Sequence, residues 1–502
     1  MIEHYLDRLA RTINENWDQP ALTDFYLTED GSTQDTSRGK HYTYGEMYSE
    51  ILRLDELFAA LGLQKGDHIA ICAANSAHWV IAYLAIAACQ GVSVTILHTQ
   101  NIEDIAHQID YSDAKALFTD IDIWNELKMH VLPQVNHVIG LDNWQILRGV
   151  ETKSSIFNLQ SSIRQAHFIH GNPDELAMIC FTSGSTNASK GVMISNRNIS
   201  NNALNAIQAF PESENRNFVC CLPLSHMYGL MIELIGQIVR GRHIFVYRDV
   251  LNIDNLWEFI ACVRPCGMAI IPYFIIHLYN KYRQDIISQW TDFFAQIHIG
   301  GSLADNRIVE DLRANHIPLS VGYGTTETAP LISDSQSPVY RLFSSGKIVE
   351  GMTARIADNG EILVKGENVM LGYYKNPEAT AQKIDSDGWL HTGDRGHLDE
   401  DGYLYVEGRL EQDMIVLPNG ENIRPEDIER KINALPEVKE SIVLARGGKL
   451  VAIVVTDADI RRHILRTINP ELPLYSQLYD VEITDIPLQK TEKQTIKRYL
   501  YK

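Results

Sequence analysis

No part of the chain is apolar for long enough to cross a membrane. The most apolar stretches are Ile81 to Cys89 and Met268 to Tyr279. Both are shorter than the roughly 20 residues that a transmembrane helix requires. The segment from Met1 to Trp17 is polar and lacks the apolar centre of a secretory signal peptide. We therefore expect a cytoplasmic protein without a membrane span.

Positive charge is scarce. The 44 Lys and Arg residues face 64 Asp and Glu residues, which gives a formal net charge of −20 over 502 residues. Such a surface repels nucleic-acid phosphates, so nucleic acid is excluded as the main partner. A local basic pocket for a small anion is still compatible with this charge.

Cysteine is present without a metal-binding pattern. Of the seven cysteines, Cys262 and Cys266 are four residues apart, but no second Cys or His pair follows them. Most of the others lie in apolar strings, as buried reduced thiols do. We therefore expect no structural zinc and no disulfide framework.

Two common catalytic motifs are missing. No Gly-x-Ser-x-Gly occurs in the chain, which argues against a serine hydrolase of acyl esters. No Gly-x-Gly-x-x-Gly occurs either, which argues against a Rossmann dehydrogenase. What is present is 45% apolar and 22% charged residues over a length that suffices for two or more domains.

Strand-like and helix-like segments alternate through the first two-thirds of the chain. His68 to Cys72 is a short apolar run typical of a buried strand, Trp79 to Cys89 is an apolar helical segment, and Val92 to Ile96 predicts the next strand. This alternation predicts an α/β fold with mainly parallel sheets covered by helices.

The pattern changes near residue 340. Gly360 to Gly366 and Gly402 to Gly408 are short strand-like runs bracketed by glycines, as in antiparallel β structure. Beyond them, Pro425 to Leu435 predicts a helix and Ala452 to Thr456 a strand. We expect an N-terminal domain at 1–408, whose last part (340–408) is β-rich, and a small, mobile α+β C-terminal domain at 409–502.

The segment from Phe181 to Gly191 carries the strongest chemical signal. Five hydroxyl side chains, two glycines and Lys190 lie in one turn that follows the apolar strand Leu176 to Cys180. Small residues let backbone N–H groups approach phosphate oxygens, and hydroxyls and an ammonium add donors. A Walker A motif fits poorly, because Ser189 stands where that motif needs glycine. The turn predicts a binding site for the phosphates of a nucleotide.

This segment resembles the phosphate loop of the adenylate-forming superfamily, which includes acyl-CoA synthetases, carrier-loading adenylation domains and luciferases. The chain departs from the pattern with Asn187 for a glycine and Ser189 for a proline. The resemblance implies binding of ATP, with Ser183, Thr186 and Lys190 on the β- and γ-phosphates. The loop residues that it assigns to the nucleotide are Thr182, Ser183, Gly184, Ser185, Thr186 and Lys190.

Two further segments extend the resemblance. Tyr323 to Glu327 is similar to the signature in which an aromatic ring covers the adenine, the second threonine meets the α-phosphate and the glutamate holds Mg²⁺. Neutralising charge where a carboxylate attacks a phosphate requires such a metal. Upstream, Gly300 to Ser302 resembles the strand-end glycines that admit the adenine. The residues implied here are Gly301, Ser302, Tyr323, Gly324, Thr325 and Thr326 for the nucleotide, with Thr326 also catalytic, and Glu327 for the metal.

The ribose and hinge positions follow in the family order. Trp389 to Asp394 resembles the Thr-Gly-Asp signature, which implies that Asp394 binds the ribose hydroxyls together with Arg409. Two residues beyond that arginine, the resemblance places the hinge of the C-terminal domain at Glu411. The run looks one residue longer than usual, so Gln412 is an equal candidate for the hinge.

The substrate is indicated by Cys221 to Leu230, which resembles the Leu-Pro-Leu-x-His-x-x-Gly segment of fatty-acyl-CoA synthetases. Family members that activate amino acids usually carry an aspartate there, and this chain has none between Cys220 and Leu230. The resemblance implies a carboxylic acid, with fatty acid the favoured class, and places His226 beside the carboxylate. Coenzyme A is the expected acceptor of the acyl group, and an acyl carrier protein is the alternative.

One departure concerns catalysis itself. The family pattern Pro-Lys-Thr-x-x-Gly-Lys-Ile-x-Arg aligns with Pro487 to Arg498 and puts Thr495 where the catalytic lysine belongs. Threonine carries no charge and cannot supply the Coulomb attraction of a lysine. Three explanations are open: Lys493 enters the site, Lys497 enters it, or the protein is a degenerate nucleotide-binding member. Lys493 is the working candidate.

Overall fold

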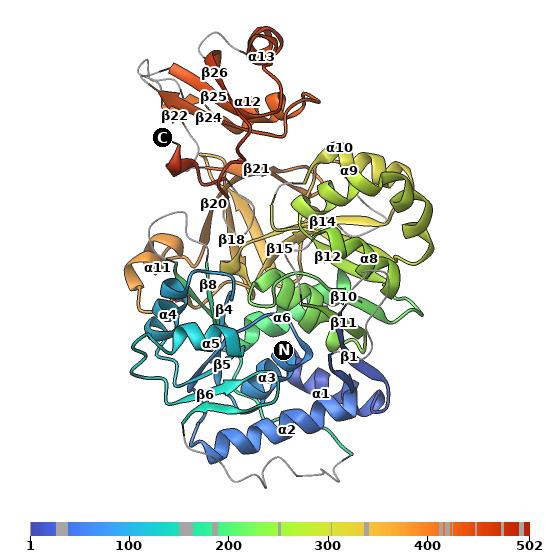
Figure 1. The fold of residues 1–502 in the computed structure, drawn as a ribbon, viewed down its shortest axis with the longest axis vertical. Helices are drawn as coiled ribbons and strands as arrows, with labels where there is room; N and C mark the ends of the chain where they lie inside the picture. Colours follow the sequence, from blue (N-terminus) through green and yellow to red (C-terminus); the bar gives the residue numbers. More distant parts are fainter. Residues whose placement is uncertain are drawn as a thin grey trace.

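The structure of the protein is a computed structural model. It describes the residues 2–26, 39–149, 164–182, 189–248, 253–302, 304–335, 341–410, 415–416, 422–423, 425–446, 449–472, 476–490 and 496–501. Figure 1 shows two large sheets in the lower body, and the last sheet of the chain at the opposite end of the long axis. The expected α/β fold, with helix-covered sheets, a β-rich part and a small C-terminal sheet, is confirmed.

One large sheet contains the predicted βαβ unit. Its strand order is β19-β9-β8-β4-β3-β5-β6-β7, parallel in the centre and antiparallel at both edges. Its strands are β3 (His68–Cys72), β4 (Val92–Ile96), β5 (Ala116–Thr119), β6 (His137–Gly140), β7 (Ile146–Arg148), β8 (Leu176–Phe181), β9 (Gly191–Ser195) and β19 (Gly372–Tyr373). The bounds of β3 and β4 equal the predicted ones.

The second large sheet has the order β16-β15-β14-β13-β12-β10-β11-β1-β2. Its strands are β1 (Pro20–Phe25), β2 (His41–Thr43), β10 (Asn217–Cys220), β11 (His243–Tyr247), β12 (Gly267–Ile270), β13 (Gln296–Ile299), β14 (Leu319–Gly324), β15 (Leu331–Asp334) and β16 (Lys347–Ile348). Strand β1 is the first strand of the chain. It pairs antiparallel with β2 and parallel with β11, which lies more than 200 residues downstream.

Helices cover both sheets, and α3 is the most deeply buried of them. Ser76 caps it by accepting from the Trp79 amide, and every residue from Ala77 to Ile86 is buried. A helix that is apolar on all sides needs cover all round, which α2 and the sheets provide. The helices before the C-terminal sheet are α1 (Tyr5–Glu15), α2 (Tyr44–Ala60), α3 (Ala77–Ala88), α4 (Ile102–Tyr111), α5 (Ile121–Leu127), α6 (Asn196–Gln208), α7 (Gly236–Ile238), α8 (Ile253–Val263), α9 (Pro272–Gln289), α10 (Asn306–Ala314) and α11 (Pro377–Lys383).

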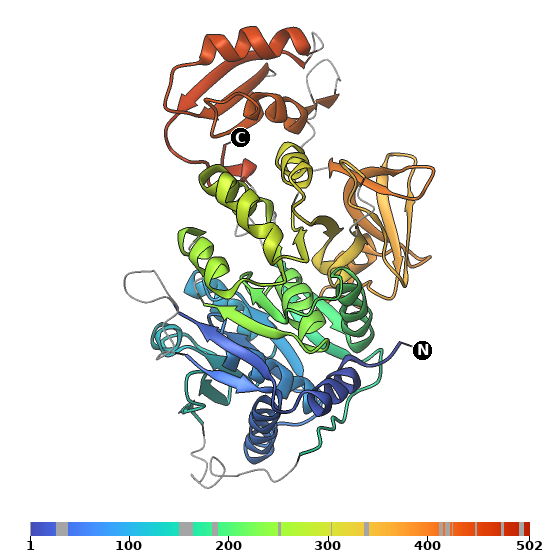
Figure 2. The same ribbon diagram turned by 90° about the vertical axis from the view of Figure 1, so that its right-hand side faces the viewer.

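The β-rich part is a four-stranded antiparallel sheet of order β17-β18-β20-β21. Its strands are β17 (Met352–Ile356), β18 (Glu361–Gly366), β20 (Leu390–Leu398) and β21 (Leu404–Arg409). Figure 2 shows this sheet beside the two large ones and below the C-terminal part. The antiparallel structure predicted from the bracketing glycines is thus confirmed.

The C-terminal sheet has a core of its own. Strands β24 (Glu440–Arg446) and β25 (Lys449–Val455) are antiparallel, and β26 (Leu478–Thr484) runs parallel to β25. Helices α12 (Pro425–Asn433) and α13 (Arg461–Ile468) pack on it through Ile428, Ile432 and Ile464. A two-stranded pair, β22 (Ile415–Val416) and β23 (Asn422–Ile423), precedes it.

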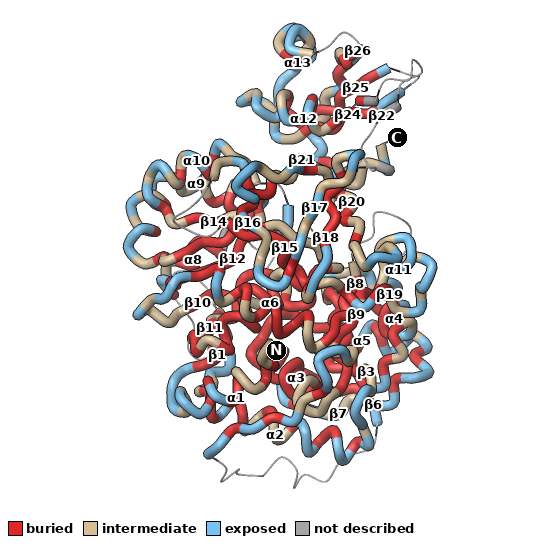
Figure 3. The backbone as a smooth tube through the Cα atoms, turned by 180° about the vertical axis from the view of Figure 1, so that it is seen from behind, coloured by how far each residue is buried: buried red, intermediate tan, exposed pale blue. Residues whose placement is uncertain are grey.

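Buried residues concentrate in the two large sheets and the helices between them (Figure 3). None of the helices in the described part of the chain is long and apolar enough to cross a membrane.

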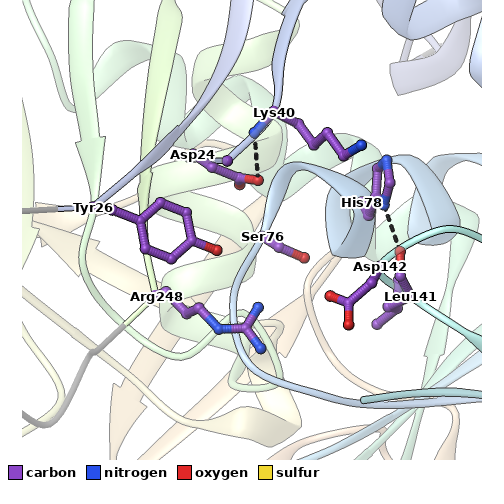
Figure 4. Close-up of a pocket in the computed structure, with 9 residues that line it drawn as sticks. Asp24, Tyr26, Lys40, Ser76, His78, Leu141, Asp142 and Arg248 are labelled. Carbon is purple, nitrogen blue, oxygen red and sulfur yellow. Dashed lines mark hydrogen bonds between the residues drawn. The ribbon is translucent and has the colours of Figure 1, made fainter. Parts of the chain in front are cut away.

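A polar cavity of about 300 Å³ lies where the two large sheets meet (Figure 4). Asp24 on β1 accepts from the Ala77 amide of α3 at 2.6 Å and from the Lys40 amide at 3.1 Å. His78 bonds the Leu141 carbonyl, and burial lowers the pKa of His78 to about 4. Several of the charged and polar groups that line the cavity bond to neighbouring protein groups. We therefore interpret these contacts as a structural connection between the two sheets.

We expect Asp24→Ala to destabilise this connection. The substitution leaves the buried Ala77 amide without its acceptor and removes the link from β1 to α3, which costs about 1–2 kcal/mol. The midpoint of thermal unfolding should fall accordingly. Asp142→Ala, at an exposed residue of the same cavity, should change stability by less than about 0.5 kcal/mol. Equal midpoints for the two variants would contradict the assignment.

Candidate functional site

The predicted phosphate loop connects two strands of one hairpin. Strand β8 pairs with β9 so that Phe181 faces Gly191. The Thr182 amide donates to the Lys190 carbonyl at 3.0 Å, and the Lys190 amide lies 3.4 Å from the Thr182 hydroxyl. The structure therefore places Thr182 and Lys190 side by side at the base of the loop. The predicted residues Ser183, Gly184, Ser185 and Thr186 lie outside the described residues.

Tyr373 joins Lys190 to the predicted metal ligand. The Tyr373 hydroxyl donates to Glu327 Oε1 at 2.7 Å. The Lys190 ammonium stands 5.1 Å from the centroid of the same ring. The Met370 amide also donates to the Glu327 carbonyl at 2.9 Å, which fixes the backbone there. Tyr373 was not predicted from the sequence, because a tyrosine in a two-residue strand carries no distinctive signal.

The turn that carries Thr325 and Thr326 depends on a close backbone approach. The Thr325 amide donates to the Pro330 carbonyl at 3.0 Å. A Cβ on Gly324 would lie 1.7 Å from that same Pro330 oxygen, so only glycine fits at the end of β14. Thr326 is buried just beyond it. The predicted residues of this segment thus occupy a tight turn facing β19.

Asp394, predicted to bind the ribose, contacts two other predicted nucleotide-binding residues. Tyr323 Oη donates to Asp394 Oδ2 at 2.6 Å, and Arg409 Nε lies 3.1 Å from Asp394 Oδ1. The register of β20 and β21 sets Asp394 directly opposite Arg409. Burial raises the pKa of Asp394, and the Arg409 charge and the Tyr323 hydrogen bond act in the opposite direction. Tyr323 and Arg409, which come from different sheets, therefore both bind the Asp394 carboxylate.

Lys383 belongs to the same cluster and was not predicted. Its ammonium donates to the Thr392 carbonyl at 3.0 Å, and Arg409 Nη1 donates to that carbonyl at 3.2 Å. Burial is the main cause that lowers the pKa of Lys383, while the carboxylates of Glu327 and Asp394 act to raise it. A single lysine at the end of a short helix gives no signal in the sequence.

The glycines after β13 lie against a buried hydrogen-bond network. A Cβ on Gly300 would lie 2.9 Å from the Tyr228 ring. Tyr228 Oη is 2.8 Å from His298 Nδ1, and His298 Nε2 is 3.1 Å from Asp334 Oδ1. The network ties the segment of His226 to β13 and β15. The predicted Gly301 and Ser302 are exposed at the end of this turn.

His226 stands partly exposed just before the π-helix Gly229–Ile235. On that helix, Glu233 is fully buried and accepts from the Leu222 amide at 2.9 Å. The Cys221 thiol lies 3.4 Å from its other oxygen. Burial raises the pKa of Glu233 to about 8, so a neutral carboxyl group holds the strand end before His226 in place.

The C-terminal lysines are only partly described. Lys493, Thr495, and the hinge candidates Glu411 and Gln412 lie outside the described residues. Lys490 forms an ion pair with Glu440, and its ammonium stands 5.8 Å from the centroid of the Tyr273 ring on α9. The structure shows an isolated bridge between Lys490 and Ile496, with Lys497 capping a 3-10 turn.

The described side chains fit a metal ion that arrives with phosphates. No group of three or more His, Cys, Asp or Glu side chains in the described ranges forms a metal cage. Mg²⁺ in nucleotide sites commonly takes one or two carboxylates together with substrate phosphates and water. Glu327, held by Tyr373 near Lys190, matches that arrangement.

The fold is an α/β architecture with a β-rich sheet beside two large sheets, and the candidate site lies where these sheets meet. A family model described as "AMP-binding enzyme" matches residues 9–374. That match covers most of the chain, and the protein belongs to the AMP-binding enzyme family.

Curated relatives match over most of their length. The medium-chain fatty-acid–CoA ligase of Escherichia coli K12 is 26% identical over 465 residues, which are 86% of this chain and 80% of the ligase. The 2-succinylbenzoate–CoA ligase of Oceanobacillus iheyensis is 27% identical over 424 residues, 83% of each protein. The o-succinylbenzoate coenzyme A synthetase of Bacillus subtilis, solved with ATP and a magnesium ion, has a TM-score of 0.79 at 23% identity and 98% coverage of both chains.

The buried carboxyl of Glu233 predicts a pH dependence of stability. Its pKa in the folded protein is about 8, against an ordinary value of 4.5. The folded protein therefore keeps a proton that the unfolded chain releases in this window. The group's contribution to the free energy of unfolding is fully present below the lower value and is lost as pH rises towards the upper one.

In Glu233→Gln, this part of the pH dependence should disappear, so the variant gains stability relative to the wild type as the pH rises. Thermal unfolding between about pH 5 and about pH 8 measures it. Glu126→Gln, at an exposed position on α5, is the matched control and should follow the wild type. A wild-type slope in Glu233→Gln would show that Glu233 is already ionised in the folded state.

Proposed function

We propose that the protein activates a fatty acid with ATP and transfers the acyl group to the thiol of coenzyme A. The products are acyl-CoA, AMP and pyrophosphate. The enzyme class, an AMP-forming acid–CoA ligase, accords with the family and with the relatives. The observation that carries the proposal is that Tyr323 and Arg409 both bind the buried carboxylate of Asp394.

In the first half-reaction, the nucleotide lies between this carboxylate and the phosphate loop. Asp394 and Arg409 hold the ribose, and the Tyr323 ring covers the adenine beside Gly301, Ser302 and Gly324. Thr325 and Thr326 bind the α-phosphate from the tight turn after β14. The loop residues Thr182 to Thr186, together with Lys190, hold the β- and γ-phosphates. The acid attacks the α-phosphate in line and pyrophosphate leaves.

Magnesium fits this arrangement through Glu327. When bound there, the ion neutralises charge on the phosphates that the carboxylate substrate approaches. The protein's own part is to fix the Glu327 oxygen with the Tyr373 hydroxyl at 2.7 Å.

The acid lies beside His226. Because no aspartate occurs between Cys220 and Leu230, nothing in that segment pairs with a substrate ammonium. A carboxylic acid without an α-amine is the substrate class, and a fatty acid is the proposed member. The relatives act on acids as different as medium-chain fatty acids and 2-succinylbenzoate, so the acid is assigned only by class.

In the second half-reaction, a thiol attacks the acyl-adenylate, whose AMP is a good leaving group. Coenzyme A is the proposed thiol, and the phosphopantetheine arm of an acyl carrier protein is the alternative acceptor. We propose a division into domains at 1–408 and 409–502, with rotation at Glu411 or Gln412 between half-reactions. The seven cysteines, which all lie in the described residues, form no disulfide in the structure, which is in keeping with the cytoplasmic location that we propose.

Lys493 is the proposed mobile lysine of the first half-reaction. The described residue that precedes it nearest in the sequence, Lys490, has its ammonium 5.8 Å from the centroid of the Tyr273 ring, near the start of α9. Two residues before Tyr273, Ile271 lies within 3.3 Å of where a Cβ on Gly301 would be. Lys490 is thus near the start of α9, which begins beside Gly301.

The first test is pyrophosphate release with ATP and Mg²⁺ across fatty acids from acetate to stearate and a set of aryl acids. Each acid is assayed with and without coenzyme A. We expect release with one preferred acid that continues through many turnovers only when coenzyme A is present. The reason is that the acyl-adenylate stays bound until a thiol removes the acyl group.

Release that stops near one turnover despite coenzyme A would identify a carrier protein as the acceptor. ATP binding without release for any acid would refute the ligase and leave a nucleotide-binding protein that has lost its catalytic lysine.

Lys493→Ala should lower the rate of acyl-AMP formation by about 10²-fold, the usual loss when one group that stabilises developing charge is removed. Single-turnover formation of acyl-AMP measures this rate. Lys497→Ala, four residues on, is the matched control, and its rate should equal that of the wild type. An unchanged rate in Lys493→Ala would eliminate Lys493, and a loss confined to Lys497→Ala would transfer the role to Lys497.

A further inference from the structure

Lys383 belongs to the cluster formed by Tyr323, Asp394 and Arg409, and the function proposed so far gives it no role. It ends α11 (Pro377–Lys383), and its ammonium donates to the Thr392 carbonyl at 3.0 Å. The next residue, Gly393, leads directly into Asp394. The Cβ position of Gly393 is 4.0 Å from Lys383 Nζ and 3.7 Å from Arg409 Nη1. Two cations therefore converge on the backbone just before the ribose carboxylate.

The surroundings of Lys383 locate the part of the nucleotide that it reaches. Asp394, the proposed ribose ligand, follows two residues after Thr392, whose carbonyl Lys383 bonds. Glu327 is the proposed metal ligand, and the carboxylates of Glu327 and Asp394 both interact electrostatically with the Lys383 ammonium. In ATP, the α-phosphate is the group between the ribose and the metal-bound β- and γ-phosphates. We therefore infer that a cation that interacts with both carboxylates, and bonds the chain just before Asp394, is near the α-phosphate of a bound nucleotide.

A cation at the α-phosphate would supply positive charge that the resembled family obtains from a C-terminal lysine. Thr495 occupies the position where the resembled family has its catalytic lysine. Attack of a carboxylate on the α-phosphate brings two anions together, and a positive charge nearby lowers the energy of that arrangement. Lys383 belongs to the part of the chain that also carries Tyr323 and Asp394, so its charge is in place before any movement of the C-terminal part.

We propose that Lys383 is a catalytic residue of acyl-AMP formation that binds a non-bridging oxygen of the α-phosphate. This inference rests on the proposed function. The carboxylate oxygen of the acid forms a bond to the α-phosphorus, and the bond from that phosphorus to the oxygen bridging to the β-phosphate breaks. The electron pair leaves with pyrophosphate. Lys383 transfers no proton; it donates a hydrogen bond and stabilises the charge that builds on the α-phosphate oxygens.

The same contact could instead only close the C-terminal end of α11, since lysine side chains often bond carbonyls near helix ends. The two roles differ in what they affect. A capping lysine contributes to stability and influences both half-reactions alike. A lysine on the α-phosphate affects acyl-AMP formation and the binding of phosphorylated nucleotides, and it does so only while it is protonated.

The test compares Lys383→Met, Lys383→Arg and the wild type in the two half-reactions separately. Lys383→Met should slow single-turnover formation of acyl-AMP by about 10²-fold. Formation of the thioester from supplied acyl-AMP and coenzyme A should stay at the wild-type rate. Lys383→Arg, which keeps a positive charge, should restore most of the first rate. Lys375→Met, which removes a surface lysine paired with Asp113, is the matched control and should leave both rates unchanged.

A pH profile separates the roles further. Burial lowers the pKa of Lys383 below the ordinary lysine value, so wild-type acyl-AMP formation should decline at alkaline pH as this ammonium loses its proton. Lys383→Arg should remove that decline, because a guanidinium stays protonated there. Equal decline in both proteins would contradict the proposal.

Binding measurements keep the inference testable if the proposed function fails. If the wild type makes no acyl-AMP with any acid, the ligase is refuted, and Lys383 is judged by calorimetry with AMP and adenosine. Lys383→Met should weaken AMP binding about tenfold, the effect of losing one charged hydrogen bond, and leave adenosine binding unchanged. Equal AMP affinity in the two proteins, or an equal loss of both half-reactions in Lys383→Met, would overturn the role.

Discussion

The carboxylate of Asp394 is buried, and the groups that offset the cost of burying it come from different strands. Tyr323 reaches it from the end of β14 in the nine-stranded sheet, and Arg409 reaches it from β21. A buried carboxylate without such partners would take up a proton and lose its charge. The Tyr323 and Arg409 contacts to Asp394 therefore tie the large sheet to the β-rich sheet, and the geometry of the nucleotide cluster depends on these two sheets keeping their relative position.

A second set of contacts connects the base of the predicted phosphate loop to the turn that carries Glu327. Tyr373 lies on β19, the edge strand that joins the eight-stranded sheet beside β9. Its hydroxyl binds Glu327 and its ring lies near Lys190, so the base of the phosphate loop and the metal ligand share one anchor. Hydrogen bonds between rigid elements place charged groups better than loops alone can. The site thus combines all three sheets of the first part of the chain.

The sequence predicted the elements whose signal is local. Strands β3 and β4 were predicted with their bounds because short apolar runs between turn residues are distinctive. Motifs mark Asp394, Arg409 and Tyr323 as candidates, and the structure brings these three side chains together. Tyr373, Lys383 and the Tyr228–His298–Asp334 network were missed. Each is an ordinary residue in a short or unremarkable element, and its meaning comes only from side chains that are distant in the sequence. Helix α12 was also predicted two residues too long, since helix ends depend on capping contacts as well as on pattern.

The order of strands in the two large sheets has a consequence for how the protein is made. Strand β1 pairs with β11, and β19 closes the sheet that contains β9, so neither sheet is complete until the chain has been synthesised well beyond its middle. Pairings between such distant segments form slowly, and N-terminal segments leave the ribosome first. The edge of β1 that will receive β11 therefore stays unpaired until β11 has been synthesised.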